Sequence, residues 1–140
     1  MHLTAHTDYA LRVLLYTAAR NEPVTISKVS DAFGVSKDHL RKVVHGLSQL
    51  GYLTTTQGRY GGIRLALDPT QINIKTVVLQ FENTRIVECF DPLTNTCPID
   101  GMCGLKGALY RAQASFMDKL GEYHLSDFLK NPNLIAFCRQ

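Results

Sequence analysis

The chain has 140 residues, which suits one domain with its own core and excludes two large domains. Hydrophobic residues make up 45% and charged residues 19%, a balance that excludes a wholly disordered chain. No apolar run approaches the roughly 18–20 residues of a membrane helix, and the first residues lack the basic and apolar regions of a signal peptide. We therefore expect a cytoplasmic protein with no membrane partner.

The formal charge of +3 is unevenly distributed along the chain. Residues 1–67 hold eight Lys/Arg against four acids, a net +4, whereas residues 68–140 hold seven against eight, a net −1. Such asymmetry is typical of a polyanion-binding region joined to a region with another task. We therefore divide one compact chain into a DNA-binding region, 1–67, and a second region, 68–140. A solvated basic face would give the same charge pattern, so charge alone does not decide.

The first quarter of the chain predicts two helices. Apolar residues at helical spacing indicate a helix over residues 7–20, with Thr7 as its N-cap and Asp8 in its first turn, where an acid suits the helix dipole. A shorter helix begins at Thr25, and Gly34 ends it in a tight turn.

A third helix and a hairpin follow. Ser36 caps the third helix, which presents apolar residues to the core at helical spacing and ends at Gly51. Strands over residues 52–56 and 63–67 then flank the Gly-rich segment 57–62, which is typical of a β-hairpin.

The second region predicts more helices around a less regular loop. Asn73 caps a helix whose apolar positions continue to Phe81. Residues 84–104 show little periodicity and carry three of the four cysteines. A longer helix over residues 104–120 has a stripe of small and apolar residues, which favours close packing on a partner helix. A short additional turn follows at residues 125–129.

The order helix, helix, tight turn, helix and Gly-tipped hairpin predicts a mainly α fold with a small β-hairpin wing, a winged helix-turn-helix. In that fold the second helix of the pair lies in the major groove, and its outward residues near the N-terminus reach base edges. Lys and Arg there also neutralise phosphates, and a helix N-terminus can donate to a phosphate. The residues expected to contact DNA from the helices are Lys28, Ser36, Lys37, Asp38, His39, Arg41 and Lys42.

The hairpin tip has the composition of a DNA-binding wing. Its glycines permit a tight turn and close backbone approach, and Arg59 is placed to enter a minor groove. We expect DNA contacts from Arg59, Tyr60 and Gly61. A solvated face or a plain turn would explain each feature alone, but the ordered set favours DNA binding. We expect no enzyme, because His124 is the only His of the second region and no Cys/His/acid set is evident.

These segments resemble the family of winged-helix iron–sulfur transcription regulators. The matching segments are 7–12 (Thr-Asp-Tyr-Ala-Leu-Arg), 35–43 (Val-Ser-Lys-Asp-His-Leu-Arg-Lys-Val) and 58–62 (Gly-Arg-Tyr-Gly-Gly). The resemblance covers nearly the whole chain and is nearest to the nitric-oxide-sensing repressors of that family. It implies a homodimer whose long helices cross, double-stranded operator DNA as partner, nitric oxide as signal, and an iron–sulfur cluster at the subunit interface.

Cys89, Cys97 and Cys103 are separated by seven and then five residues. Thiolates are the usual ligands of iron–sulfur clusters, and three on one loop can hold three irons of a cubane. We therefore expect a 4Fe–4S cluster, with a 2Fe–2S cluster as the alternative. The spacing alone also fits a zinc site or a thiol switch. Cys138 lies outside the loop, and we expect it to be a packing thiol.

The fourth ligand depends on the resemblance. Cluster-assembly members of the family have a His three residues after the last loop cysteine, where this chain has Lys106. Nitric-oxide-sensing members use an Asp near the start of the first helix, from the other subunit, and Asp8 stands at the matching position. The resemblance thus implies Asp8 as fourth ligand. Without the resemblance, the sequence favours Asp8 as a first-turn acid that pairs with Arg12, four residues further on.

The resulting hypothesis is a DNA-binding repressor whose operator binding is controlled by an iron–sulfur cluster that reacts with nitric oxide. The alternative is a cluster-free winged-helix regulator that responds to thiol oxidation, a metabolite or a partner protein. A constitutive DNA binder with a structural zinc site would also fit the cysteines.

Overall fold

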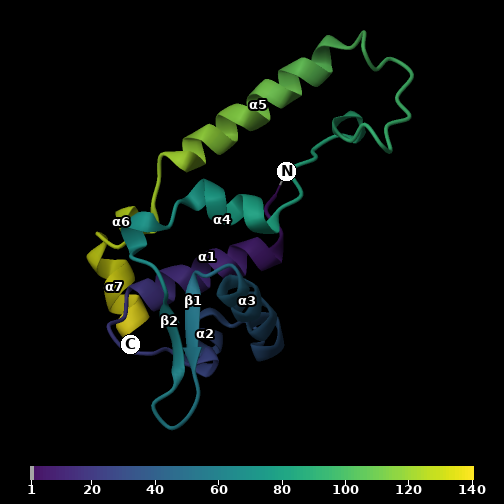
Figure 1. The fold of residues 1–140 in the computed structure, drawn as a ribbon. Coiled ribbons are helices and arrows are strands. Elements are labelled where there is room, and N and C mark those ends of the chain that lie inside the picture. The colour runs from purple at the N-terminus through teal and green to yellow at the C-terminus, as the bar shows by residue number, and fades with distance from the viewer. Residues whose placement is uncertain (1) are drawn as a thin grey trace.

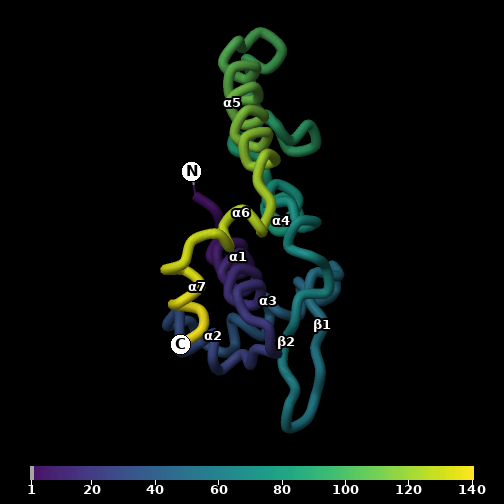
Figure 2. The backbone as a smooth tube through the Cα atoms, turned by 90° about the vertical axis from the view of Figure 1, so that its left-hand side faces the viewer, coloured from purple at the N-terminus to yellow at the C-terminus, as the bar shows by residue number. Residues whose placement is uncertain are grey.

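The structure, a computed structural model, describes residues 2–140. Its first half forms α1 (Ala5–Ala18), α2 (Ile26–Phe33), α3 (Lys37–Gln49), β1 (Leu53–Thr56) and β2 (Gly62–Leu65). The remainder forms the 3-10 turns η1 (Pro69–Gln71) and η2 (Glu88–Phe90) and the helices α4 (Ile74–Phe81), α5 (Gly104–Gly121), α6 (Leu125–Phe128) and α7 (Pro132–Arg139). The molecule is elongated: α5 lies at one end and the β1–β2 hairpin at the other (Figures 1 and 2).

Local capping chemistry explains most helix boundaries. The side chains of Thr25, Ser36 and Asn73 each accept a hydrogen bond from the backbone amide three residues on, as an N-cap does. Gly34, with φ +64°, and Gly51, with φ +80°, adopt the left-handed conformation that ends α2 and α3. These five predictions from the sequence are confirmed.

The start of α1 differs from the prediction. Thr4, and not Thr7, is the N-cap: its Oγ1 accepts from the Thr7 amide at 3.4 Å, and its carbonyl accepts from the Asp8 amide at 3.0 Å. Thr7 is fully buried inside the first turn. The prediction of Thr7 as N-cap was therefore wrong by three residues, whereas Asp8 does lie in the first turn.

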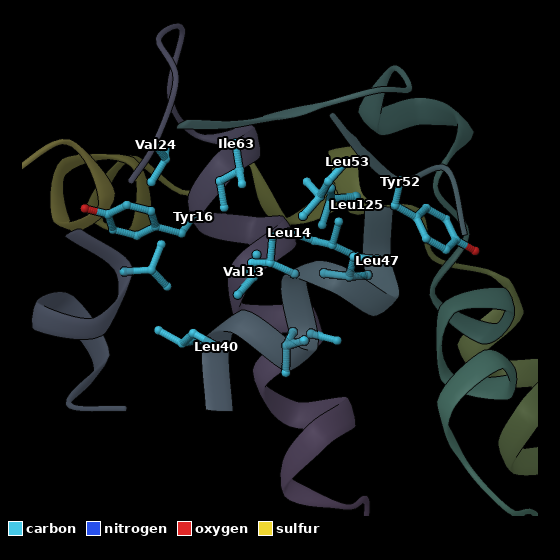
Figure 3. Packing of buried hydrophobic residues seen from close by; sticks show 14 of the residues in the cluster. Val13, Leu14, Tyr16, Val24, Leu40, Leu47, Tyr52, Leu53, Ile63 and Leu125 are labelled. Atoms are coloured by element: carbon cyan, nitrogen blue, oxygen red, sulfur yellow. The ribbon is translucent and has the colours of Figure 1, made fainter. Parts of the chain in front are cut away.

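One core joins both halves of the chain, with α1 at its centre. Figure 3 shows Leu14 of α1 beside Leu47 of α3 and Leu125 of α6, and all three side chains are fully buried. The second half also contributes Ile72, Val77 and Cys138 to this core. Any shift of α1 therefore acts on a densely packed interior that includes α3.

Helix α5 is exceptional because none of its residues is buried within the chain. It packs mainly against α4 and leaves Leu105, Tyr110 and Phe116 exposed. Ala108 and Ala112, from the predicted small-residue stripe, are exposed as well. The face that the sequence assigns to a partner helix is thus uncovered in a single copy. Within residues 2–140 no helix is long and apolar enough to cross a membrane.

Glu82, just after α4, fixes the start of α1. Its Oε1 accepts from the Thr4 amide at 2.7 Å and from the Thr4 hydroxyl at 2.9 Å. Burial acts to raise the pKa of this carboxyl, but hydrogen bonds from Thr7 and Thr4 and the charge of His2 outweigh it. The pKa of Glu82 consequently lies below its ordinary value of 4.5. Ionised Glu82 therefore stabilises the fold above pH 4.5, and this contribution is lost as the pH falls through the lower, folded-state pKa.

Glu82→Gln is expected to lower the melting temperature by about 2–4 °C at pH 7, because a neutral amide accepts hydrogen bonds from Thr4 less strongly than a carboxylate does. The difference from wild type should shrink as the pH is lowered through the folded-state pKa of Glu82, because the wild-type carboxyl then becomes neutral as well. Thermal unfolding followed by circular dichroism at several pH values measures both effects. Glu122→Gln, which alters an exposed pair with Lys119, is the matched control. A deficit that stays constant from pH 7 down to the start of acid unfolding would contradict the assignment.

Candidate functional site

Helix α3 turns one face to the core and the other to solvent. Leu40, Val43 and Leu47 are buried, and their helical spacing fixes the orientation of the whole helix. Its solvent face begins at the N-terminus, where the exposed residues are Ser36, Lys37, Asp38, His39, Arg41 and Lys42. The structure therefore brings the helix residues that the sequence assigns to DNA onto one accessible surface, except Lys28 on α2.

The charges on this surface are only partly neutralised within the chain. Arg41 Nη1 lies 2.5 Å from Asp38 Oδ1, one helical turn earlier. Lys28 pairs with Glu22 at 3.5 Å. Lys37 and Lys42 form no ion pair with any residue that the structure describes. These two ammonium groups are therefore the most available for phosphate, whereas Arg41 must exchange one partner for another.

The hairpin extends beyond the helices of the first half (Figure 1). Strands β1 and β2 are antiparallel, with Leu53 opposite Leu65 and Thr56 opposite Gly62. The hairpin is tied to the body by Val24, which exchanges backbone hydrogen bonds of 2.9 and 2.7 Å with Ile63.

Two exposed side chains occupy the tip of the hairpin. Arg59 places its guanidinium 5.9 Å from the centre of the Tyr60 ring, and the Tyr60 side chain is 85% exposed. Among the described residues Arg59 has no acidic partner. The tip thus offers an unpaired cation beside an aromatic ring.

Gly61 is required by close backbone approach at the tip. A Cβ at this position would lie 2.3 Å from the Thr56 carbonyl oxygen and 2.8 Å from the Gln57 carbonyl carbon. Both contacts are with backbone, which has little freedom to move aside. Gly61 is therefore needed for the shape of the tip, whether or not it touches DNA.

Gly61→Ala is expected to distort the hairpin tip and to weaken operator binding by about tenfold, because Arg59 and Tyr60 lose their positions. The melting temperature should change little, since the tip lies outside the core. Fluorescence anisotropy with operator DNA and thermal unfolding measure the two effects. Gln57→Ala removes an exposed side chain from the same tip without a clash and is the matched control. Unchanged affinity in Gly61→Ala would contradict a role for the tip.

The cysteine loop lies between α4 and α5, away from the winged half (Figure 1). Cys89 lies in η2, Cys97 in the middle of the loop, and Cys103 is the N-cap residue of α5. All three are free thiols and half-buried. In the described part of the chain, no three His, Cys, Asp or Glu side chains are gathered into a ready-made metal site. One loop thus carries the three thiols without yet assembling them.

The donor set nevertheless fits an iron–sulfur cluster. Three free thiols on one loop are the ligand type that such clusters use. Cys103 makes no capping hydrogen bond, so its sulfur is free to bind elsewhere.

Asp8 is paired within its own helix. Its two carboxylate oxygens accept from Arg12 Nε at 3.1 Å and Arg12 Nη2 at 2.6 Å. The Asp8 side chain is 45% exposed, and it does not join a ligand group with the cysteines of the same chain. In a single copy, Asp8 is thus the helix acid that the sequence alone favours, and a ligand role requires a second copy.

The sequence indicates turn-forming residues in the cysteine loop but does not predict the hydrogen bonds that join them. Asp100, Asn95 and Lys106 form a hydrogen-bonded group in the loop, and their spacing in the sequence carries no recognised signal. Cys138, by contrast, is fully buried, as expected for a packing thiol. Burial raises the pKa of the Cys138 thiol, which disfavours its reactive thiolate form.

Comparisons with known proteins place this geometry in a family. The Rrf2 family, described as "Iron-dependent Transcriptional regulator", matches residues 3–131. The "HTH-type transcriptional regulator NsrR" of Bacillus subtilis (strain 168) is 46% identical over 134 residues, which cover 94% of this chain and 92% of the relative. The protein of the same name from Shouchella clausii (strain KSM-K16) is 45% identical and covered to 90%.

Solved structures share the fold. The B. subtilis global cysteine regulator CymR superposes with a TM-score of 0.74 at 18% identity, covering 93% of this chain and 97% of that one. T. potens IscR gives a TM-score of 0.73 at 18% identity, covering 93% and 87%. The predicted winged helix-turn-helix is confirmed, and so is the expectation of a DNA-binding regulator that is not an enzyme. The chain belongs to the Rrf2 family of transcriptional regulators.

Proposed function

We propose that the protein is a cytoplasmic, homodimeric repressor whose operator binding depends on an iron–sulfur cluster that reacts with nitric oxide. One observation carries this proposal: Cys89, Cys97 and Cys103 lie as free, half-buried thiols on one loop of a chain whose relatives at 42–46% identity are named NsrR. The choice of nitric oxide as the signal rests on the sequence resemblance to nitric-oxide-sensing repressors.

Operator binding is assigned to α3 and the hairpin tip. Lys37 and Lys42 would neutralise phosphates beside the major groove, and Arg59 would enter the adjacent minor groove. The remaining proposed contacts are Lys28, Ser36, Asp38, His39, Arg41, Tyr60 and Gly61. Two copies of the chain would present two such surfaces to a pseudo-palindromic operator, with the recognition helices about 34 Å apart.

The proposed cluster ligands are Cys89, Cys97 and Cys103 of one copy and Asp8 of the other. The uncovered apolar face of α5 supports a dimer, and the partial exposure of Asp8 leaves its carboxylate accessible to a second chain. When bound, a 4Fe–4S or 2Fe–2S cluster supplies the iron with which nitric oxide reacts. A carboxylate holds iron less firmly than a thiolate does, so the Asp8 position is the weakest of the four.

Helix α1 links the Asp8 position to the DNA-reading helices. The ring of Tyr9 lies 6.2 Å from the ring of His39 at the start of α3. The Arg12 guanidinium lies 5.8 Å from the Phe33 ring of α2. Arg12 donates a hydrogen bond to each carboxylate oxygen of Asp8, so a metal bound by Asp8 would either share an oxygen with Arg12 or displace it. A change at Asp8 would in this way reach Tyr9 and Arg12, the side chains that lie against α3 and α2.

The test is an anaerobic absorption spectrum with iron and sulfide analysis, recorded beside operator footprinting before and after nitric oxide. We expect a visible chromophore and a specific footprint, with the chromophore altered and the footprint lost after nitric oxide. Iron-free, colourless protein whose footprint ignores nitric oxide would overturn the proposal and favour the cluster-free regulator. Stoichiometric zinc would instead identify a structural metal site.

A further inference from the structure

The residues that flank the cysteines are joined by hydrogen bonds across the loop. Glu88 precedes Cys89, and Thr96 precedes Cys97. Glu88 Oε1 accepts from the Thr96 amide at 2.8 Å and from the Thr96 hydroxyl at 2.7 Å. This Glu88–Thr96 clasp holds the backbone beside Cys89 next to the backbone beside Cys97.

A second group, the Asp100 clasp, joins the middle of the loop to α5. Asp100 Oδ2 accepts from Asn95 Nδ2 at 2.6 Å, and Asp100 Oδ1 accepts from Lys106 Nζ at 2.6 Å. Asn95 Oδ1 in turn accepts from the Cys97 amide at 3.0 Å. Since Lys106 lies in the first turn of α5, this chain of bonds connects the Cys97 backbone to the helix end that carries Cys103.

The base of the loop is closed separately. Asp91, which is only 8% exposed, accepts from the Leu93 amide at 3.1 Å and the Thr94 hydroxyl at 3.0 Å, and it pairs with Arg85. The loop therefore has an internal polar framework from its start to the first turn of α5. This framework is present although, among the described residues, the three thiols are not gathered into a metal site.

The Lys106 ammonium is a cation at the α5 end of the loop. Its Nζ is held 2.6 Å from Asp100 Oδ1, which keeps its positive charge within the cysteine loop. Three thiolates and a carboxylate concentrate negative charge, which a neighbouring ammonium offsets.

We infer that the Glu88–Thr96 clasp and the Asp100 clasp are positioning devices that order the backbones of Cys89, Cys97 and Cys103 before a metal group binds. Lys106 is then a positioning cation and not a ligand. The physical reason is that a loop ordered in advance loses less conformational entropy on binding. The identity of the bound group rests on the proposed function, but the ordering of the loop does not.

The test uses Asp100→Ala and Thr96→Val, one variant for each clasp, in the full-length protein. In the metal-free protein, backbone hydrogen exchange of residues 88–106 is expected to be about fivefold faster in each variant. After anaerobic reconstitution, iron loss to a ferrous chelator is expected to be about tenfold faster than in wild type, the low end for residues that orient metal ligands. Asp118→Ala breaks a 2.8 Å pair with Lys75 at the opposite end of α5 and is the matched control.

The Lys106→Met variant tests whether Lys106 positions the loop or itself binds the metal. It is expected to retain the wild-type absorption maxima and to lose iron as fast as Asp100→Ala does. Shifted maxima would make Lys106 a ligand and overturn its assignment. Exchange at the wild-type rate in both clasp variants would overturn the inference whatever the metal content. Wild type that binds no iron, combined with faster exchange in the variants, would instead overturn the proposed function and support the clasps.

Discussion

Cys97→Ala is expected to abolish the visible absorption of the anaerobically purified protein and to weaken operator binding by about a hundredfold or more, toward nonspecific affinity. Cys97 is the central thiol of the loop, and its amide is held by Asn95. Removing it leaves two thiolates on the loop, too few for the three-thiolate set. An absorption spectrum with iron analysis, followed by anaerobic anisotropy titrations with operator DNA, measures both losses.

Cys138→Ala is the matched control, because it removes a thiol of the same chain that lies in the core and not in the loop. It should retain the chromophore and operator affinity and lose about 1 kcal/mol of unfolding free energy through poorer packing. A wild-type spectrum in Cys97→Ala would exclude the cluster. Equal loss of colour in both variants would show that the effect arises from general destabilisation.

Helix boundaries were predictable where a single local hydrogen bond sets them. Ser36 and Asn73 cap their helices through amides three residues away, so the sequence contains all that is needed. Thr7 was misassigned because the sequence offers two threonines, and the choice of Thr4 is stabilised by Glu82, 78 residues further on. Helix α7 was missed although Asn131 and Pro132 form a recognised start, since its short apolar pattern has few positions.

In the candidate site, too, features set by local sequence were predictable and features set by contacts between distant segments were not. Helical periodicity sufficed to predict which residues of α3 face solvent. The need for Gly61 arises from the backbone of Thr56, and that contact depends on how the hairpin closes. The role of Asp8 was the hardest to predict from the sequence. Its pair with Arg12 is local, whereas a role as ligand depends on a second copy of the chain. The spacing in the sequence therefore predicted the ion pair between Asp8 and Arg12. Only the family resemblance suggested Asp8 as a cluster ligand.

Arg59→Ala is expected to weaken operator binding by about 10–100-fold and to reduce the slope of log affinity against log salt by about one. Arg59 is an exposed guanidinium at the hairpin tip with no acidic partner among the described residues, so its charge is available to DNA. Lys130→Ala is the matched control: it also removes one positive charge, but from a 79% exposed side chain in the second half that pairs with Asp127. Its salt slope should equal that of wild type.

Arg59→Lys distinguishes a minor-groove contact from a simple phosphate contact. Both side chains carry one positive charge, so the salt slope should stay at its wild-type value. A narrow A·T-rich minor groove favours guanidinium over the more strongly hydrated ammonium, so affinity should still fall. Replacing A·T by G·C pairs in the operator flank should then weaken wild type more than Arg59→Ala. If Arg59→Lys binds as tightly as wild type and the flank has no effect, Arg59 contacts only phosphate. Full affinity and an unaltered slope in Arg59→Ala would remove the hairpin from the DNA interface and leave α3 as the sole reading element.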